Sequence, residues 1–119
     1  MDFDSSIPIF RQITDVFRVK IISGKMRLGE RVPAVRELAA EYVVNPNTMQ
    51  RALALLEQEG LLYTERTSGR FVTENADVIE RAKAEMLDAE VSGFLSRMAS
   101  MGYSGEDIFA ALKDKGETV

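Results

Sequence analysis

The chain has 119 residues and a net charge of −4, from 15 Lys and Arg against 19 Asp and Glu, and it contains no His, Cys or Trp. This length holds one compact domain, or one small domain with an appendage, but not a second catalytic domain. The lack of Cys and His excludes disulfides, thiolate or imidazole catalysis and the usual zinc sites, so we expect neither a metal nor a cofactor.

The acidic excess is confined to the last third of the chain. Residues 1–74 contain 10 basic and 10 acidic side chains, whereas residues 75–119 contain 5 basic and 9 acidic ones. Between Arg18 and Arg36 there are 6 basic side chains and 1 acidic one. This asymmetry is typical of a nucleic-acid-facing half joined to a solvated or dimerising half, although a basic run is also found on ordinary solvated faces.

Membrane insertion and export are not expected. The apolar runs are much shorter than the ~20 residues of a membrane span, and the N-terminus has no basic region leading into an apolar one. We therefore expect a cytoplasmic protein with no membrane partner.

The first half of the chain predicts two helices and a connector. Pro8 suits a first helical turn, apolar residues follow at intervals of three and four, and Gly24 ends this first helix. Residues 25–33 mix Gly, Pro and charge, which indicates an ordered connector. A short second helix fits Ala34 to Glu41, and Tyr42 to Val44 form a turn.

A third helix should follow this turn. Asn45 can cap it, Pro46 suits its first position, and Gly60 is the expected left-handed residue after its end at Glu59. Its inward positions are apolar and its opposite face is polar with one arginine. The residues of this outer face are Asn47, Gln50, Arg51, Ala54 and Gln58.

The next segment changes from helical to strand periodicity. Residues 61–66 and 71–74 are β-prone runs joined by a Ser-Gly tip, which predicts a hairpin. Arg66 and Arg70 should flank this tip.

The last third returns to helix, from about Asp77 to Met101, and a short final helix should begin after a capping sequence at Ser104 to Asp107. The long helix carries an apolar seam at intervals of four and three over two heptads, which indicates packing against a second copy. The residues expected to hold a homodimer are Leu87, Val91, Phe94, Leu95, Met98 and Met101.

Three helices followed by a β-hairpin are the element order of a winged helix-turn-helix. In such a domain the third helix enters the major groove and the hairpin, or wing, lies along the DNA backbone or minor groove. We expect bases to be read by Asn47, Thr48, Gln50 and Arg51. We expect Arg36, Arg66, Arg70 and some connector residues to neutralise phosphates.

An ordered series of motifs resembles the DNA-binding domain of GntR-family bacterial repressors. The motifs are Pro8-Ile9-Phe10-x-Gln12-Ile13, Gly24-x-x-x-x-Gly29-x-x-Val32-Pro33-x-x-Arg36-x-Leu38-Ala39, Val44-Asn45-Pro46-Asn47-Thr48-Met49, Leu56-Glu57-x-Glu59-Gly60-Leu61 and Gly69-x-Phe71-Val72. The short helical tail resembles that of the YtrA-like subgroup, in which it serves chiefly for dimerisation. At Ala34, however, the family usually has a capping Ser, and at Thr67 it usually has a wing glycine.

The resemblance implies DNA contacts from Arg36, Asn45, Asn47, Thr48 and the wing around Gly69. It also implies a homodimeric transcriptional regulator, usually a repressor, that binds an inverted-repeat operator. The expected fold is mainly α with a small β-hairpin: a winged helix-turn-helix in residues 1–74 and a two-helix dimerisation tail in residues 75–119. Whether a small-molecule effector releases the DNA is left open.

Other interpretations exist for the same arginines. Arg36 can pair with Glu37 or Glu41. Arg66 and Arg70 can be cross-strand partners of Glu65 and Glu74.

The main alternative function is that of a winged helix that binds protein rather than DNA. Such a protein would need an exposed apolar stripe on the third helix, and the polar outer face predicted above argues against it. No pairing of carboxylates predicts a catalytic cleft, so we do not expect an enzyme.

Overall fold

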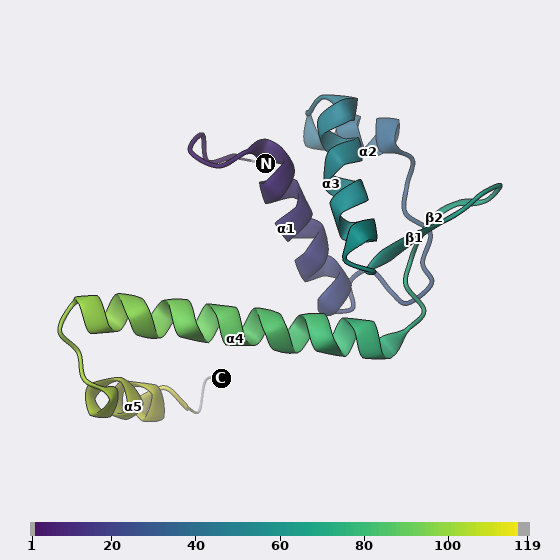
Figure 1. Cartoon of the computed structure of the whole chain (residues 1–119). Helices are drawn as coiled ribbons and strands as arrows, with labels where there is room; N and C mark the ends of the chain where they lie inside the picture. The colour runs from purple at the N-terminus through teal and green to yellow at the C-terminus, as the bar shows by residue number, and fades with distance from the viewer. Residues whose placement is uncertain (1, 117–119) are drawn as a thin grey trace. The chain divides into compact units, whose positions relative to one another are not determined.

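The computed structural model describes residues 2–116 of the chain and has five helices and one β-hairpin in that part. Contacts divide the chain into two units, Met1–Lys83 and Ala84–Val119, which are described separately. In chain order the elements are α1 (Ile9–Ile22), α2 (Val35–Tyr42), α3 (Pro46–Gln58), β1 (Leu62–Glu65), β2 (Gly69–Val72), α4 (Ala76–Ser100) and α5 (Gly105–Asp114) (Figure 1). The expected fold class is thus confirmed, with element bounds that differ slightly from the expected ones.

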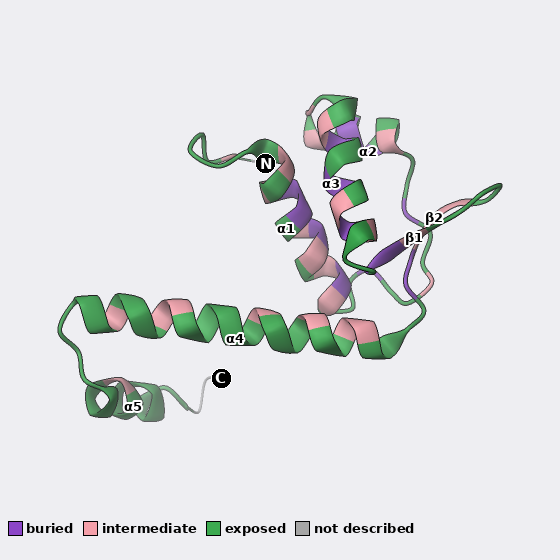
Figure 2. Ribbon diagram, viewed as in Figure 1, coloured by how far each residue is buried: buried purple, intermediate pink, exposed green. Residues whose placement is uncertain are grey.

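The core of the first unit lies between α1, α2, α3 and the root of the hairpin, where Figure 2 shows the buried residues. The inward positions of α3, which repeat every three or four residues, are fully buried, as the helical period predicts. The start of α4 packs against the same core through Val78, Ile79 and Ala82. The buried apolar residues are Ile13, Phe17, Ile21, Met26, Val32, Leu38, Ala39, Met49, Ala52, Leu53, Leu56, Leu61, Leu62 and Val72.

The turn between α2 and α3 differs in detail from the expected one. Tyr42 is the last residue of α2 rather than the first of the turn, and Val43 follows it in the left-handed region, at φ 56° and ψ 54°. A β-branched residue is strained in this region because its Cβ approaches the following carbonyl oxygen. The amide of Val44 then donates to the carbonyl of Ala39 at 2.9 Å and closes the turn.

The connector between α1 and α2 pairs with strand β2 of the wing, which its composition did not predict. The amide of Val32 donates to the carbonyl of Arg70 at 2.8 Å, and the amide of Val72 donates to the carbonyl of Glu30 at 2.9 Å. Between these two hydrogen bonds Arg31 forms an antiparallel bridge with Phe71. Strand β2 is therefore paired on both sides, with β1 and with the connector, which fixes the base of the wing.

The second unit contains the rest of α4 and α5. Neither α4 nor α5 has a buried residue. The capping box at the start of α5 is confirmed, because Ser104 accepts a hydrogen bond from the amide of Asp107 at 3.1 Å and the Asp107 carboxylate accepts one from the amide of Ser104 at 3.0 Å. Within residues 2–116, no helix is long and apolar enough to cross a membrane.

Candidate nucleic-acid interface

The N-terminus of α3 is built as the sequence predicted. The side-chain oxygen of Asn45 accepts a hydrogen bond from the amide of Asn47 at 2.8 Å, and Pro46 occupies the first turn, where it leaves no amide unpaired. Asn47 is exposed and Thr48 is partly exposed. The helix therefore presents a capped amino end and two short polar side chains to solvent.

One face of α3 is buried and the opposite face is open. Met49, Ala52 and Leu53 have 0% exposure, while Gln50 and Arg51 between them are exposed. This arrangement follows from the 100° turn per residue of a helix. The outer face is polar, so the exposed apolar stripe that the protein-binding alternative requires is absent from the described α3.

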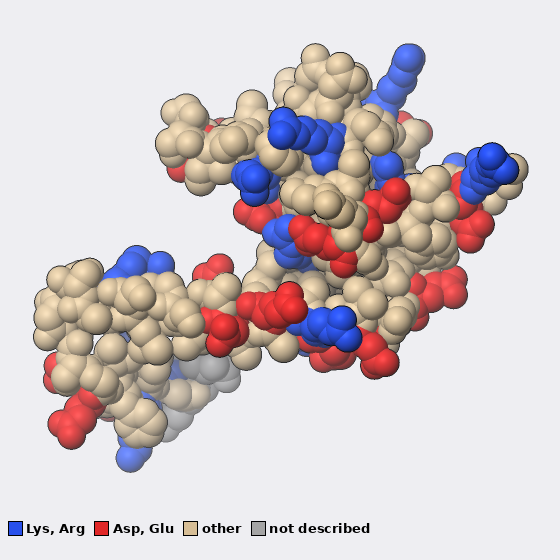
Figure 3. Space-filling model, in the orientation of Figure 1, with Lys and Arg blue, Asp and Glu red and all other residues tan. Residues whose placement is uncertain are grey.

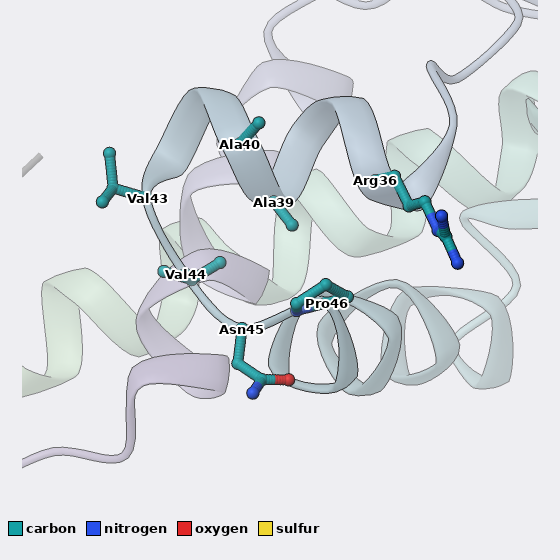
Figure 4. A pocket seen from close by; sticks show the side chains of 7 residues that line it. All are labelled: Arg36, Ala39, Ala40, Val43, Val44, Asn45 and Pro46. Carbon is teal, nitrogen blue, oxygen red and sulfur yellow. The ribbon is translucent and has the colours of Figure 1, made fainter.

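Arg36 lies in the first turn of α2, at the edge of a hollow of about 710 Å³. Figure 4 shows Arg36 at one end of α2 and Val43 at the other, with Asn45 and Pro46 at the start of α3. Arg36 is exposed and, in the described part of the chain, takes part in no ion pair. The suggested pairing with Glu37 or Glu41 is therefore wrong for this structure, and the guanidinium is available to an external anion.

The two wing arginines are not equivalent. Arg66 lies in the turn of the hairpin and is exposed, and within residues 2–116 it forms no ion pair, so its suggested cross-strand pairing is wrong. Figure 3 shows Lys and Arg atoms at this tip. Arg70 lies in β2 opposite Thr64, so it does not flank the tip as expected.

Arg70 instead contacts the end of the third helix. Its Nε lies 3.2 Å from Oε1 of Glu57, and its side chain is only 16% exposed. The suggested pairing of Arg70 with Glu65 or Glu74 is therefore also wrong, because its carboxylate partner belongs to α3 and not to the wing. Glu74 accepts a hydrogen bond from the hydroxyl of Tyr63.

Glu57 also accepts a hydrogen bond from the hydroxyl of Thr64 in β1. This hydrogen bond is the main cause that lowers the pKa of Glu57, and Arg70 adds to it against an opposing effect of desolvation. One carboxylate of α3 thus holds both strands of the wing. No direct signal in the sequence predicts this contact, because Glu57 is 7 residues from Thr64 and 13 from Arg70 and lies in a different element.

Gly69 is in the strand and not at the tip of the turn. It has φ +111°, and a Cβ added there would lie 3.4 Å from Nε of Arg31. A side chain at this position would be strained by its backbone conformation, whereas its contact with the Arg31 side chain would be an ordinary van der Waals contact. Gly69 therefore allows the positive φ with which β2 begins.

Arg51 has a partner that the sequence did not predict. Its guanidinium carbon lies 3.8 Å from the centroid of the Phe10 ring in α1, within the range of a cation–π interaction. Phe10, Asn47, Thr48 and Arg51 line a hollow of about 400 Å³ together with Ile9. The sequence does show an aromatic residue, Phe10, directly after Pro8-Ile9. Nothing in the sequence, however, places this residue beside the third helix.

The second unit carries the residues expected to form a dimer. Leu87 is 66% exposed, Val91 and Leu95 are 45% exposed and Met101 is 59% exposed, while Phe94 and Met98 are partly exposed. The same unit exposes further large apolar side chains, Tyr103, Phe109 and Leu112, that were not predicted as interface residues. In the described residues, no group of three or more His, Cys, Asp or Glu side chains could hold a metal ion.

Comparisons with known proteins agree with this architecture. Residues 10–72 match the model of bacterial regulatory proteins of the gntR family. The HTH-type transcriptional repressor YtrA of Bacillus subtilis is 35% identical over 103 residues, which cover 78% of this chain and 79% of the relative. The resemblance to YtrA-like members of the family is thereby confirmed.

Solved structures show the same fold. A GntR family transcriptional regulator from Listeria monocytogenes has a TM-score of 0.88 and 37% identity, and the match covers 94% of this chain and 98% of that one. The DNA-binding domain of AraR in complex with operator ORR3 has a TM-score of 0.55 and 26% identity over 61% of this chain and 88% of that one. The family is one of transcription regulators and not of enzymes. This chain belongs to the gntR family of bacterial regulatory proteins and is a transcriptional regulator with a DNA-binding winged helix-turn-helix domain.

Proposed function

We propose that the protein is a cytoplasmic transcriptional repressor that binds an inverted-repeat operator as a homodimer. The observation that carries this proposal is the outer face of α3, on which Asn47, Gln50 and Arg51 are exposed while the opposite face is fully buried. A helix of this width fits the major groove, and its amide and guanidinium groups match the hydrogen-bonding edges of bases. The name of the YtrA relative, a repressor, and the operator complex of AraR support this interpretation.

The proposed base readers are at the start and along the outer face of α3. Asn47 and Gln50 can pair with adenine, Arg51 can pair with guanine, and the Thr48 hydroxyl can contact a base edge or a phosphate. Asn45 is primarily the helix cap, and because the amino end of a helix attracts anions it also favours a phosphate at this place. These contacts would set the sequence preference of the protein.

The proposed phosphate contacts lie outside this helix, in α2 and the wing. Arg36 and Arg66 are exposed and form no ion pair in the described chain, so each can neutralise a phosphate without breaking an internal ion pair. Gly69 allows the positive φ with which β2 of the wing begins. For Arg70 we propose a role in holding the wing against α3 rather than a phosphate contact.

We also propose that residues 75–119 hold the dimer and residues 1–74 bind DNA. The contact-based division falls at Lys83, inside α4, so the helix would belong to both parts. The exposed apolar side chains from Leu87 to Met101 support dimerisation, because unpartnered apolar surface of this kind is typical of an interface. A twofold dimer presents two α3 helices and therefore needs an operator with twofold symmetry.

The experiment that tests this function is selection of duplexes from a random pool by the wild-type protein. We expect one enriched inverted repeat, with affinity that falls steeply as the salt concentration rises because bound phosphates release counterions. Recovery of no preferred duplex, together with binding that does not depend on salt, would contradict DNA recognition and favour the protein-binding alternative.

Two variants then separate the proposed roles. Arg36→Ala should weaken binding of selected and scrambled duplexes alike. It should also reduce by about 1 the salt slope, which is the steepness with which the logarithm of affinity falls with the logarithm of salt concentration. Arg51→Ala should weaken the binding free energy by about 1–3 kcal/mol for the selected duplex and by much less for the scrambled one. Lys83→Ala, which removes an exposed charge from α4, is the matched control and should change neither value.

A further inference from the structure

The stack between Arg51 and Phe10 joins two elements that are far apart in the sequence. The guanidinium carbon of Arg51 lies 3.8 Å from the centroid of the Phe10 ring, while that of Arg11 lies 5.3 Å from the same centroid. Both distances fall within about 6 Å, the usual limit of a cation–π interaction, and the shorter one belongs to Arg51. Phe10 is partly buried and packs against the core.

The backbones that carry these two side chains are held together by a buried residue. The hydroxyl of Thr14 lies 2.8 Å from the carbonyl oxygen of Phe10 and 3.3 Å from that of Ala52, which follows Arg51 in α3. Thr14 is 1% exposed, so water does not compete for this shared hydrogen bond. The separation of Phe10 and Arg51 is therefore fixed by the packing of α1 on α3.

Arg51 remains accessible although it is stacked. Arg51 is exposed. Together with Phe10 it lines a hollow that also contains Asn47 and Thr48, two of the proposed base readers. An arginine side chain has many rotamers, and each immobilised side chain of this kind lowers binding affinity through lost conformational entropy. A side chain that is already held in one orientation loses less entropy when it meets a base.

We propose that Phe10 is a positioning residue for base recognition, whose ring holds the Arg51 guanidinium on the DNA-reading face of α3. The proposal rests on the function proposed above. It extends the determinants of specificity from α3 to α1, because Phe10 acts through Arg51 without touching a base. The aromatic ring, and not only an apolar side chain, is required at this position because the attraction depends on the negative face of the ring.

The test uses the full chain and the duplex that the wild-type protein selects from a random pool, with a scrambled duplex of the same composition as reference. The measured quantity is the ratio of the two affinities for the wild type, for the single variants F10L, F10Y and R51A, and for the double variant F10L/R51A. We expect F10L to lower the ratio about three- to thirtyfold and F10Y to keep it within about threefold of the wild-type ratio. In the R51A background, F10L should have no further effect on the ratio, because the residue through which it acts is gone.

Controls separate this role from a purely structural one. A variant that is merely unfolded would lose affinity for both duplexes, so unchanged affinity of F10L for the scrambled duplex shows that the domain is folded. Should F10L lower stability too far, Phe10→Met provides a flexible apolar replacement without a ring. Arg11→Ala removes the more distant cation at the same ring and should leave the ratio unchanged.

Three outcomes overturn the proposal. F10L with a wild-type ratio would show that the ring does not position Arg51, and an equal loss in the presence and absence of Arg51 would show that Phe10 acts through packing alone. A rise in the ratio for F10L would show that the ring sequesters Arg51 from DNA. If the wild-type protein itself prefers no duplex, the proposed function fails first, and this result is distinct from the other three.

Discussion

Arg70 of the wing and Glu57 of the third helix form an ion pair, with 3.2 Å between Nε and Oε1. Together with the hydrogen bond from Thr64 to the same carboxylate, this pair connects both strands of the wing to α3. The helix that would read bases and the wing that would follow the backbone are therefore held at a fixed spacing.

Replacement of the two wing arginines should have different effects on DNA binding. Arg66→Ala removes a charge at the tip and should reduce the salt slope of duplex binding by about 1. Arg70→Ala should also weaken binding, because the wing is less well positioned, but should leave the salt slope unchanged. Titration of a duplex at several salt concentrations by fluorescence anisotropy measures both values, and a reduced slope for Arg70→Ala would show that Arg70 contacts phosphate itself.

The contact at Glu57 should make stability depend on pH. Its pKa is lowered from the ordinary value of 4.5, first by the Thr64 hydroxyl and then by Arg70. The charged form therefore stabilises the folded protein above about pH 4.5, and this contribution is lost as the pH falls through the lower folded pKa. We expect Glu57→Gln to be less stable than the wild type at pH 7, by less than about 1 kcal/mol because the pair is partly exposed.

Urea denaturation at pH 7 and at about pH 3, below the ordinary carboxylate pKa, measures this difference. Other carboxylates titrate in both proteins, so only the difference between wild type and Glu57→Gln reports on Glu57. The two free energies of unfolding should approach each other at the lower pH. A difference that persists there would assign the effect to packing rather than to charge.

Val43 is a position where substitution should increase stability. Its left-handed backbone conformation costs about 1–2 kcal/mol for an ordinary residue, and its side chain is 85% exposed, so little packing is lost on removal. Val43→Gly relieves this strain but has a larger entropy in the unfolded state, and the net gain should be about 1 kcal/mol. For a domain of this size such a gain raises Tm by about 4–8 °C.

Thermal denaturation followed by circular dichroism measures the change at Val43. Val43→Ala is the control, since it removes the β-branch but keeps the Cβ and should give a smaller gain. A Tm for Val43→Gly at or below the wild-type value would show that the turn is not under the strain that its φ angle implies.

A charge on the apolar seam of α4 should separate the proposed dimer. Phe94→Glu places a carboxylate among apolar side chains that would be buried between two copies, and burial of an unpaired charge is strongly unfavourable. Sedimentation should show a dimer for the wild type and a monomer for this variant. Ser92→Glu, which lies on the far side of the helix from Phe94, should remain dimeric, and a dimeric Phe94→Glu would remove this seam from the interface.

Local features of the fold could be predicted from the sequence with good accuracy. Asn45 and Pro46 predicted the start of α3, Ser104 and Asp107 predicted the capping box of α5, and the apolar period predicted which side of α3 is buried. The physical reason is that helix caps and helical periodicity are set by residues at most a few positions apart. The outward direction of Gln50 and Arg51 follows from the same rule.

Contacts between distant residues could not be predicted in this way. The pairing of the connector with β2, the ion pair of Arg70 with Glu57 and the stack of Arg51 on Phe10 join residues in different elements. Each depends on how the helices and strands pack around the core, for which composition and periodicity hold no signal. Local sequence patterns are therefore enough to predict the order of the elements, the caps of α3 and α5 and the polar face of α3. Tertiary packing sets which arginines are paired, because the partners of Arg51 and Arg70 lie on other elements that only the fold brings beside them.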